Sequence, residues 1–159
     1  MIRAETLIYG DELSPLQQRT AFRRLGYDGV PAPDVEIPAD NCLKLWVIML
    51  LGRLQFLSPE QRDLLIEEMM PQLDGLGEAM LAGTSTGTPM LVIGDGQYAA
   101  WHGKTGLLDM SNGVTLQSPP RDILESVAYN LAVLFARNRV ACREIQERND
   151  AQRSSPEAT

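Results

Sequence analysis

The residue best suited to acid–base catalysis is His102, the only histidine of the chain. Catalysis by an imidazole requires a hydrogen-bonded partner, and Asp95 and Asp109 are the carboxylates that could approach it across neighbouring strands. Serine and threonine side chains in residues 84–88 could supply a nucleophile, but G-x-S-x-G and other nucleophile signatures are absent. We therefore assign no catalytic residue and expect His102 to be a turn residue. A small hydrolase or transferase that uses His102 remains one alternative.

Metal and cofactor sites need clusters of ligands or glycine-rich motifs. Cys42 and Cys142 are far apart in the sequence, each among apolar residues, which is typical of two buried, reduced thiols. No D-x-D-x-D-G calcium loop occurs, and the glycine-rich segments 83–87 and 94–96 lack the G-K-[ST] of a phosphate loop. The sequence thus predicts no metal and no cofactor.

The net charge of −7 is concentrated in one segment. Residues 31–80 hold nine acidic and three basic side chains, which gives −6. Such a field serves solubility, repels phosphate backbones and favours a protein partner with a basic surface. The methionines near these acids are expected mainly to fill the core, but beside the acids they could also form an adaptable binding surface. The predicted partner-binding residues are Glu67, Glu68, Met69, Met70, Asp74 and Glu78.

Three arginines, Arg19, Arg23 and Arg24, could contact phosphate groups. A helix-turn-helix needs a short turn and a second helix, whereas a proline-rich loop over 26–40 follows them. We expect these arginines to pair with the chain's own acids, so nucleic-acid binding is disfavoured. A dimeric DNA-associated accessory or regulatory factor is the first alternative, ahead of an enzyme that uses His102.

Serine–proline pairs mark the beginnings of helices, because serine caps an orphan amide and proline at the next position loses no bond. Ser14-Pro15 and Ser58-Pro59 each have glutamine three residues after the serine, which completes a capping box. The first pair predicts a helix to Leu25. The second predicts a helix to Met70, then a break at Pro71 and a short helix that ends at Gly83.

A central helix is predicted from Asp40 or Asn41, either of which could cap it, to Leu57. It is apolar on nearly every side, which is typical of a helix covered by its neighbours. Trp46 and Phe56 are its expected large anchors. Before these helices, residues 6–9 could form a short strand or an extended arm.

Short β-prone runs separated by glycine-containing turns follow over about 89–117. They predict a three- or four-stranded antiparallel meander. The expected fold is α+β: a bundle of four to five helices with this meander inserted before a long C-terminal helix. We expect one globular domain over 1–148 and a disordered tail over 149–159.

The C-terminal helix is predicted over 119–148, roughly 45 Å at 1.5 Å per residue, and is therefore at least as long as the domain. Its apolar residues follow a heptad pattern, with a single asparagine where a paired helix tolerates a polar residue. The stripe could join two chains as a homodimer or pack on the chain's own helices. The predicted dimerisation residues are Leu124, Leu131, Leu134, Asn138 and Ile145.

The longest apolar run, Leu45–Leu51, is far shorter than the ~20 residues needed to span a bilayer, and the N-terminus resembles no signal peptide. Arginine outnumbers lysine by 12 to 2, which suggests a bacterial genome rich in G and C. The sequence therefore predicts a cytoplasmic, non-enzymatic, acidic protein-interaction module. An adaptor, a chaperone or an inhibitor such as an immunity or anti-defence protein would fit this description.

Overall fold

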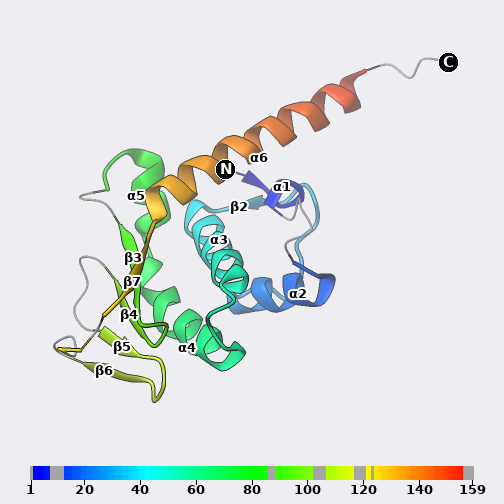
Figure 1. The fold of residues 1–159 in the computed structure, drawn as a ribbon. Helices are drawn as coiled ribbons and strands as arrows, with labels where there is room; N and C mark the ends of the chain where they lie inside the picture. The colour runs from blue at the N-terminus through cyan, green and yellow to red at the C-terminus, as the bar shows by residue number, and fades with distance from the viewer. Residues whose placement is uncertain are drawn as a thin grey trace.

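The computed structural model describes residues 2–7, 13–85, 89–101, 107–116, 121–122 and 124–155. It confirms the predicted α+β class, with a helical part, an antiparallel sheet and a long C-terminal helix. The sheet lies on one side of α4 and α5, and α6 crosses over the top of the helices (Figure 1). None of the helices within the described residues is long and apolar enough to cross a membrane.

The N-terminal part consists of β1 (Ile2–Arg3), α1 (Ala4–Leu7), α2 (Pro15–Arg24) and β2 (Glu36–Ile37). Strands β1 and β2 pair antiparallel, so β2 interrupts the loop predicted over 26–40. Residues 6 and 7 are helical, which corrects the predicted strand or arm there; residues 8 and 9 lie outside the described part. Helix α2 begins with the predicted capping box at Ser14.

Helix α3 (Ala39–Arg53) is the hub of the core, and Trp46 is buried as predicted, at 3% exposure. Its indole packs edge-on against Phe135 of α6, with ring centroids 5.6 Å apart. The prediction for Phe56 is wrong: the chain leaves the helix at Leu54, whose backbone is extended, and Phe56 is 49% exposed. The predicted caps are also wrong, because Pro38 occupies the N-cap position without a side-chain bond.

Helix α4 (Pro59–Met69), the 3₁₀ turn η1 (Met70–Leu73) and α5 (Leu76–Ala82) follow. The capping box at Ser58 and the break at Pro71 are confirmed. Proline cannot donate the next helical hydrogen bond, so the helix tightens into the 3₁₀ turn. Gly75 then reverses the chain with a φ of 78°, a conformation that costs glycine little.

The predicted meander is confirmed as four strands: β3 (Met90–Gly94), β4 (Tyr98–Trp101), β5 (Leu107–Asp109) and β6 (Val114–Leu116). A fifth strand, β7 (Ser126–Asn130), joins it beside β3, so the sheet order is β6-β5-β4-β3-β7. The prediction that residues 126–130 are helical is therefore wrong. Their backbone groups are satisfied by pairing with β3 instead of by helical bonds.

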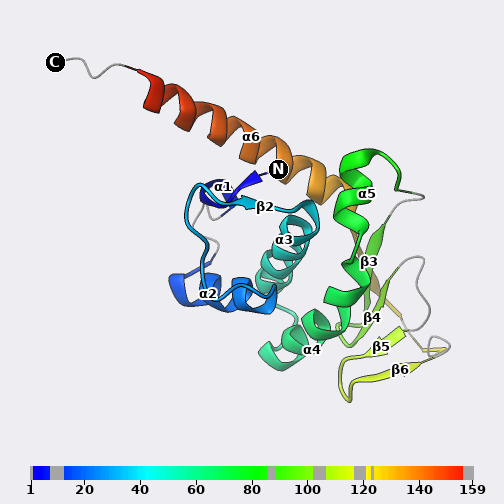
Figure 2. The same ribbon diagram turned by 180° about the vertical axis from the view of Figure 1, so that it is seen from behind.

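Helix α6 (Leu131–Ser154) begins twelve residues later than the position 119 predicted. Asn130 caps it, because its side-chain oxygen accepts the Val133 N–H at 3.1 Å. The helix also continues past Arg148, so residues 149–154 of the predicted tail are helical. Its last turns extend beyond the rest of the fold, as both views show (Figures 1 and 2). Ion pairs between Arg3 and Asp150 (2.6 Å) and between Arg153 and Glu5 (2.8 Å) tie them to the N-terminus.

Candidate functional site: the α5–α6 groove

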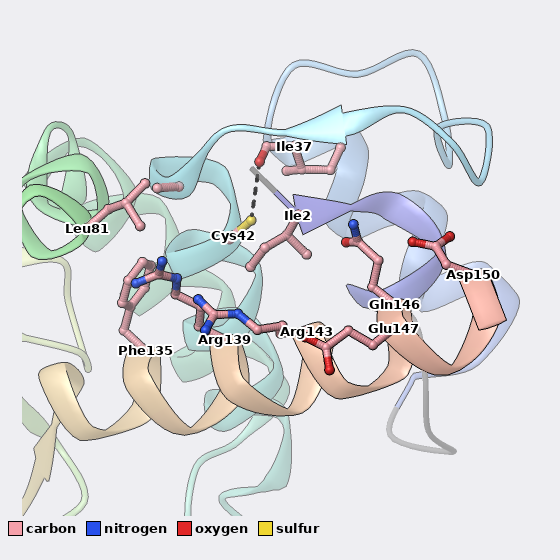
Figure 3. A pocket seen from close by; sticks show the side chains of 11 residues that line it. Ile2, Ile37, Cys42, Leu81, Phe135, Arg139, Arg143, Gln146, Glu147 and Asp150 are labelled. Atoms are coloured by element: carbon pink, nitrogen blue, oxygen red, sulfur yellow. Dashed lines mark hydrogen bonds between the residues drawn. The ribbon is translucent and has the colours of Figure 1, made fainter.

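Two adjoining hollows lie along one side of α6 and share Phe135, Arg139 and Arg143; we call them together the α5–α6 groove. The first hollow, of ≈ 350 Å³, is shown in Figure 3. It is lined by Ile2, Ile37, Ala39, Cys42, Leu81, Phe135, Arg139, Arg143, Gln146, Glu147 and Asp150. The second, of ≈ 460 Å³, is lined by Met80, Ser85, Pro89, Ala132, Phe135, Ala136, Arg139, Val140 and Arg143.

The floor of the groove is apolar because it is a gap in the core between elements far apart in the sequence. Ile2 and Ile37 are paired residues of β1 and β2, and Phe135 comes from α6. The walls expose apolar side chains to solvent: Leu81 of α5 is 36% exposed, and Val140 of α6 is 54% exposed. Concave apolar surface with a few polar groups is the usual form of a binding site.

Arg139 and Arg143 are the charged groups at the centre of the groove. They are four residues apart on α6 and so lie on one face of the helix. Figure 3 shows both side chains reaching up from α6 into the hollow. No carboxylate of the described residues lies within ion-pair distance of either guanidinium, whereas Arg3, Arg24 and Arg153 all have such a partner.

The carboxylates that line one end of the groove, Asp150 and Glu147, are partly neutralised by Arg3. Asp150 is held by Arg3 at 2.6 Å, and the same arginine donates to the Gln146 carbonyl oxygen at 3.5 Å. Glu147 is the remaining carboxylate that lines the hollow. Because Arg139 and Arg143 have no carboxylate partner in the described part of the chain, the middle of the groove is positive, although the net charge of the chain is −7.

The cysteine that lines the groove is poorly suited to covalent chemistry. Cys42 is fully buried at its floor, and its thiol donates to the Ile37 carbonyl oxygen at 3.6 Å. Burial raises the pKa of this thiol to about 12, so the nucleophilic thiolate is scarce at neutral pH. Within the described ranges, no three histidine, cysteine or acidic side chains are grouped to hold a metal ion. What the groove can do is bury an apolar group while pairing an anion with arginine.

The predicted acidic surface does not form a single patch. Glu67 and Glu68 are exposed on α4, but Met69 is 3% exposed and belongs to the core, which corrects its predicted role at a surface. Met70 is half-buried. Asp74 forms an ion pair with Lys44, and Glu78 accepts the Ala39 N–H at 3.1 Å. These last two acids are used within the fold.

The predicted arginine cluster is also partly used within the fold. Arg24 pairs with Asp63 at 2.8 Å, as expected for an arginine that serves the chain's own acids. The Arg23 Nε donates to the Asp28 carbonyl oxygen at 3.3 Å. Arg19 is exposed on α2.

The predicted dimerisation stripe is divided by the structure. Leu124 is 90% exposed but precedes β7 and is not helical, while Leu131 is fully buried in the core. Leu134, Asn138 and Ile145 are half-buried on α6, and the last two line a small hollow together with Trp46. The members of the stripe that belong to α6 therefore pack toward α3, and the predicted set does not form one free surface.

His102 and residues 86–88 lie outside the described part of the chain. Both proposed carboxylate partners of His102 are engaged in turns. Asp109 accepts from the Ser111 hydroxyl at 2.6 Å and backbone N–H at 2.9 Å, and these bonds lower its pKa. Asp95 accepts from the Leu124 and Glu125 amides, at 3.2 Å and 2.9 Å for its Oδ1, which holds the segment before β7 against the β3–β4 turn.

Arg139 and Arg143 were not predicted as site residues, because no local feature of the sequence distinguishes them from solvated helix residues. Their one local signal is the four-residue spacing of two arginines on a helix with apolar neighbours. The groove itself forms because α5 and the β1–β2 pair pack near α6. No local sequence pattern predicts this packing. No protein-family model, curated protein or solved structure matches the chain.

Proposed function

We propose that this chain is a non-enzymatic protein-interaction module whose α5–α6 groove holds an acidic, apolar segment of a partner protein. The observation that carries the proposal is the pair Arg139 and Arg143, which have no carboxylate partner among the described residues and line a groove together with apolar side chains. An arginine guanidinium matches a carboxylate with two parallel hydrogen bonds, so this pair favours aspartate or glutamate in the ligand.

The apolar floor supplies the second part of the recognition. Burying one leucine-sized side chain from the ligand contributes about 1.5–3 kcal/mol. An amphipathic helix that lays its apolar face into a groove is a common way to recognise a peptide. Leu81 in the first hollow and Val140 in the second would then contact the apolar face of the segment.

The positive charge in the groove changes the expected partner, which the acidic sequence predicted to have a basic surface. The exposed Glu67 and Glu68 on α4 still favour basic groups, while the groove favours carboxylates. A partner with an acidic apolar segment and basic residues elsewhere on its surface would satisfy both regions. We place this binding in the bacterial cytoplasm, where free thiols such as those of Cys42 and Cys142 stay reduced.

The proposal can be tested with a synthetic peptide of about 15 residues that has leucines at i, i+3, i+4 and i+7 and glutamates between them. We expect its titration to shift the backbone NMR signals of Leu81, Phe135 and Val140. The same peptide with lysine in place of glutamate should bind at least about tenfold more weakly.

Arg139→Gln and Arg143→Gln should each raise the Kd of the acidic peptide about tenfold, as expected when a hydrogen bond to a charged group is lost. Arg137→Gln is the matched control, because Arg137 is exposed on the same helix and does not line the groove. Equal binding of the two peptides, or signal shifts away from the groove, would refute the proposal.

A further inference from the structure

Strand β7 forms one edge of the sheet. Its five residues pair with β3 on one side, and no described strand lies on the other. The strand contains no charged residue and no proline: its sequence is Ser-Val-Ala-Tyr-Asn. Proteins usually guard an open edge with charges, proline, a bulge or a covering element, because its free backbone groups can pair with another chain.

The hydrogen bonds around β7 show which backbone groups are free. The Asp95 N–H donates to the Glu125 carbonyl oxygen at 2.8 Å, and the Leu131 N–H donates to that of Pro89 at 2.9 Å. In an antiparallel pair, hydrogen-bonded positions alternate along each strand. Val127 and Tyr129 therefore direct their backbone groups toward β3. Ser126 and Ala128 direct theirs outward, to the open edge.

These outward groups are symmetric about Val127. If two copies of β7 run antiparallel with Val127 opposite Val127, Ser126 of each strand faces Ala128 of the other. Each such pair exchanges two N–H···O bonds, which gives four in total. The two Val127 side chains then occupy the closely spaced position, with Cα atoms about 4.5 Å apart.

The side chain of Val127 is placed to benefit from this pairing. It lies directly opposite Ile93 of β3, so both point to the same face of the sheet. Ile93 is buried at 1% exposure, whereas Val127 at the edge is 45% exposed. A second copy of the strand would extend the sheet past Val127 and cover part of its exposed apolar surface.

We propose that the chain forms a two-fold homodimer through antiparallel pairing of its β7 strands, which joins the two five-stranded sheets into one. A second copy fits better than a foreign strand because the edge is self-complementary and uncharged, so it repels no copy of itself. Closed two-fold dimers are also the commonest oligomers. This interface uses β7 and leaves the α5–α6 groove free, so the dimer does not depend on the proposed function.

The test is the solution mass of the full chain by light scattering across a range of concentrations. We expect the wild type to reach twice 17.6 kDa at high micromolar concentration. Val127→Lys places a charge beside its own copy at the two-fold axis. It should raise the dimer Kd by about tenfold or more, while circular dichroism still reports a folded chain.

Ala128→Pro gives an independent test, because it removes an N–H that points away from β3 and proline is tolerated on edge strands. It should also shift the mass toward the monomer. Val114→Lys is the matched control on the opposite edge strand, β6, where Val114 is 51% exposed; this variant should remain dimeric. A monomeric wild type, a dimeric Val127→Lys, or a dimer that Val114→Lys also disrupts would overturn the proposal.

Discussion

Helix α5 is joined to α3 by hydrogen bonds between their N-termini and faces α6 across an open groove. On the closed side, which we call the α3–α5 junction, Asp40 accepts the Gly75 and Glu78 N–H groups at 2.6 and 2.9 Å. Glu78 in return accepts the Ala39 N–H at 3.1 Å. On the open side, Leu81 faces Arg139 and Arg143 across the groove.

The junction brings together the N-termini of two helices, each with amides that have no partner inside the helix. The first turn of each helix supplies a carboxylate to the other, which also suits the positive end of each helix dipole. The two sides of α5 therefore differ in whether their charged groups find partners within the chain. Charges that meet their complement within the chain stabilise the fold, and charges left beside apolar surface are available to a ligand.

Trp46→Ala should have the largest effect on stability, because Trp46 is buried and supports both regions. It lies on α3, the helix whose N-terminus forms the junction, and packs against Phe135, which lines the groove. We expect a loss of about 3–5 kcal/mol in the free energy of unfolding, measured by urea denaturation. A change below about 1 kcal/mol would show that α3 is not the hub of the core.

Gly77→Ala should have the next largest effect, and it probes the junction alone. A Cβ atom at Gly77 would lie 2.4 Å from the Ala39 carbonyl oxygen and 2.8 Å from the Asp40 Cα, so α3 and α5 would have to move apart. Overpacking of this kind costs about 1–3 kcal/mol. The measurement is the same urea denaturation.

Gly52→Ala is the matched control for Gly77→Ala. Gly52 also lies in a helix, but apart from its chain neighbours and its own helix backbone, no atom of the described residues lies within 4 Å of its added Cβ. Alanine there should be neutral or add up to about 1 kcal/mol through its better helix propensity. If both variants behaved alike, close approach of the backbones would not explain Gly77.

Much of this fold could be predicted from the sequence, because several of its helix ends and turns are determined by residues close together in the chain. The capping boxes at Ser14 and Ser58, the break at Pro71 and the strands of the meander are all set by neighbouring residues. Strand β7 was missed because its valine, alanine and tyrosine continue the apolar spacing of the helix that follows. The asparagine at 130 was the available signal, since it is a preferred helix cap.

The α3–α5 junction and the α5–α6 groove could not be predicted from the sequence, because both depend on which helices and strands pack against one another. Asp40 was expected to cap its own helix, but it lies inside the first turn and caps α5 instead. Glu78 and Asp74 looked like free surface acids, and each has a partner more than twenty-five residues away in the sequence. Whether an ionic side chain is paired is a property of tertiary contacts, so no local pattern reports it.

The smallest expected effect comes from removing charge on the open side. Asp40→Ala leaves two helix amides without their acceptor and should cost about 0.5–2 kcal/mol. Arg143→Gln breaks no ion pair among the described residues and should change the free energy of unfolding by less than about 0.5 kcal/mol. Both values come from urea denaturation. If Arg143→Gln cost as much as Asp40→Ala, this arginine would serve the fold, and the groove would lose one of the two charges that suit it to an acidic ligand.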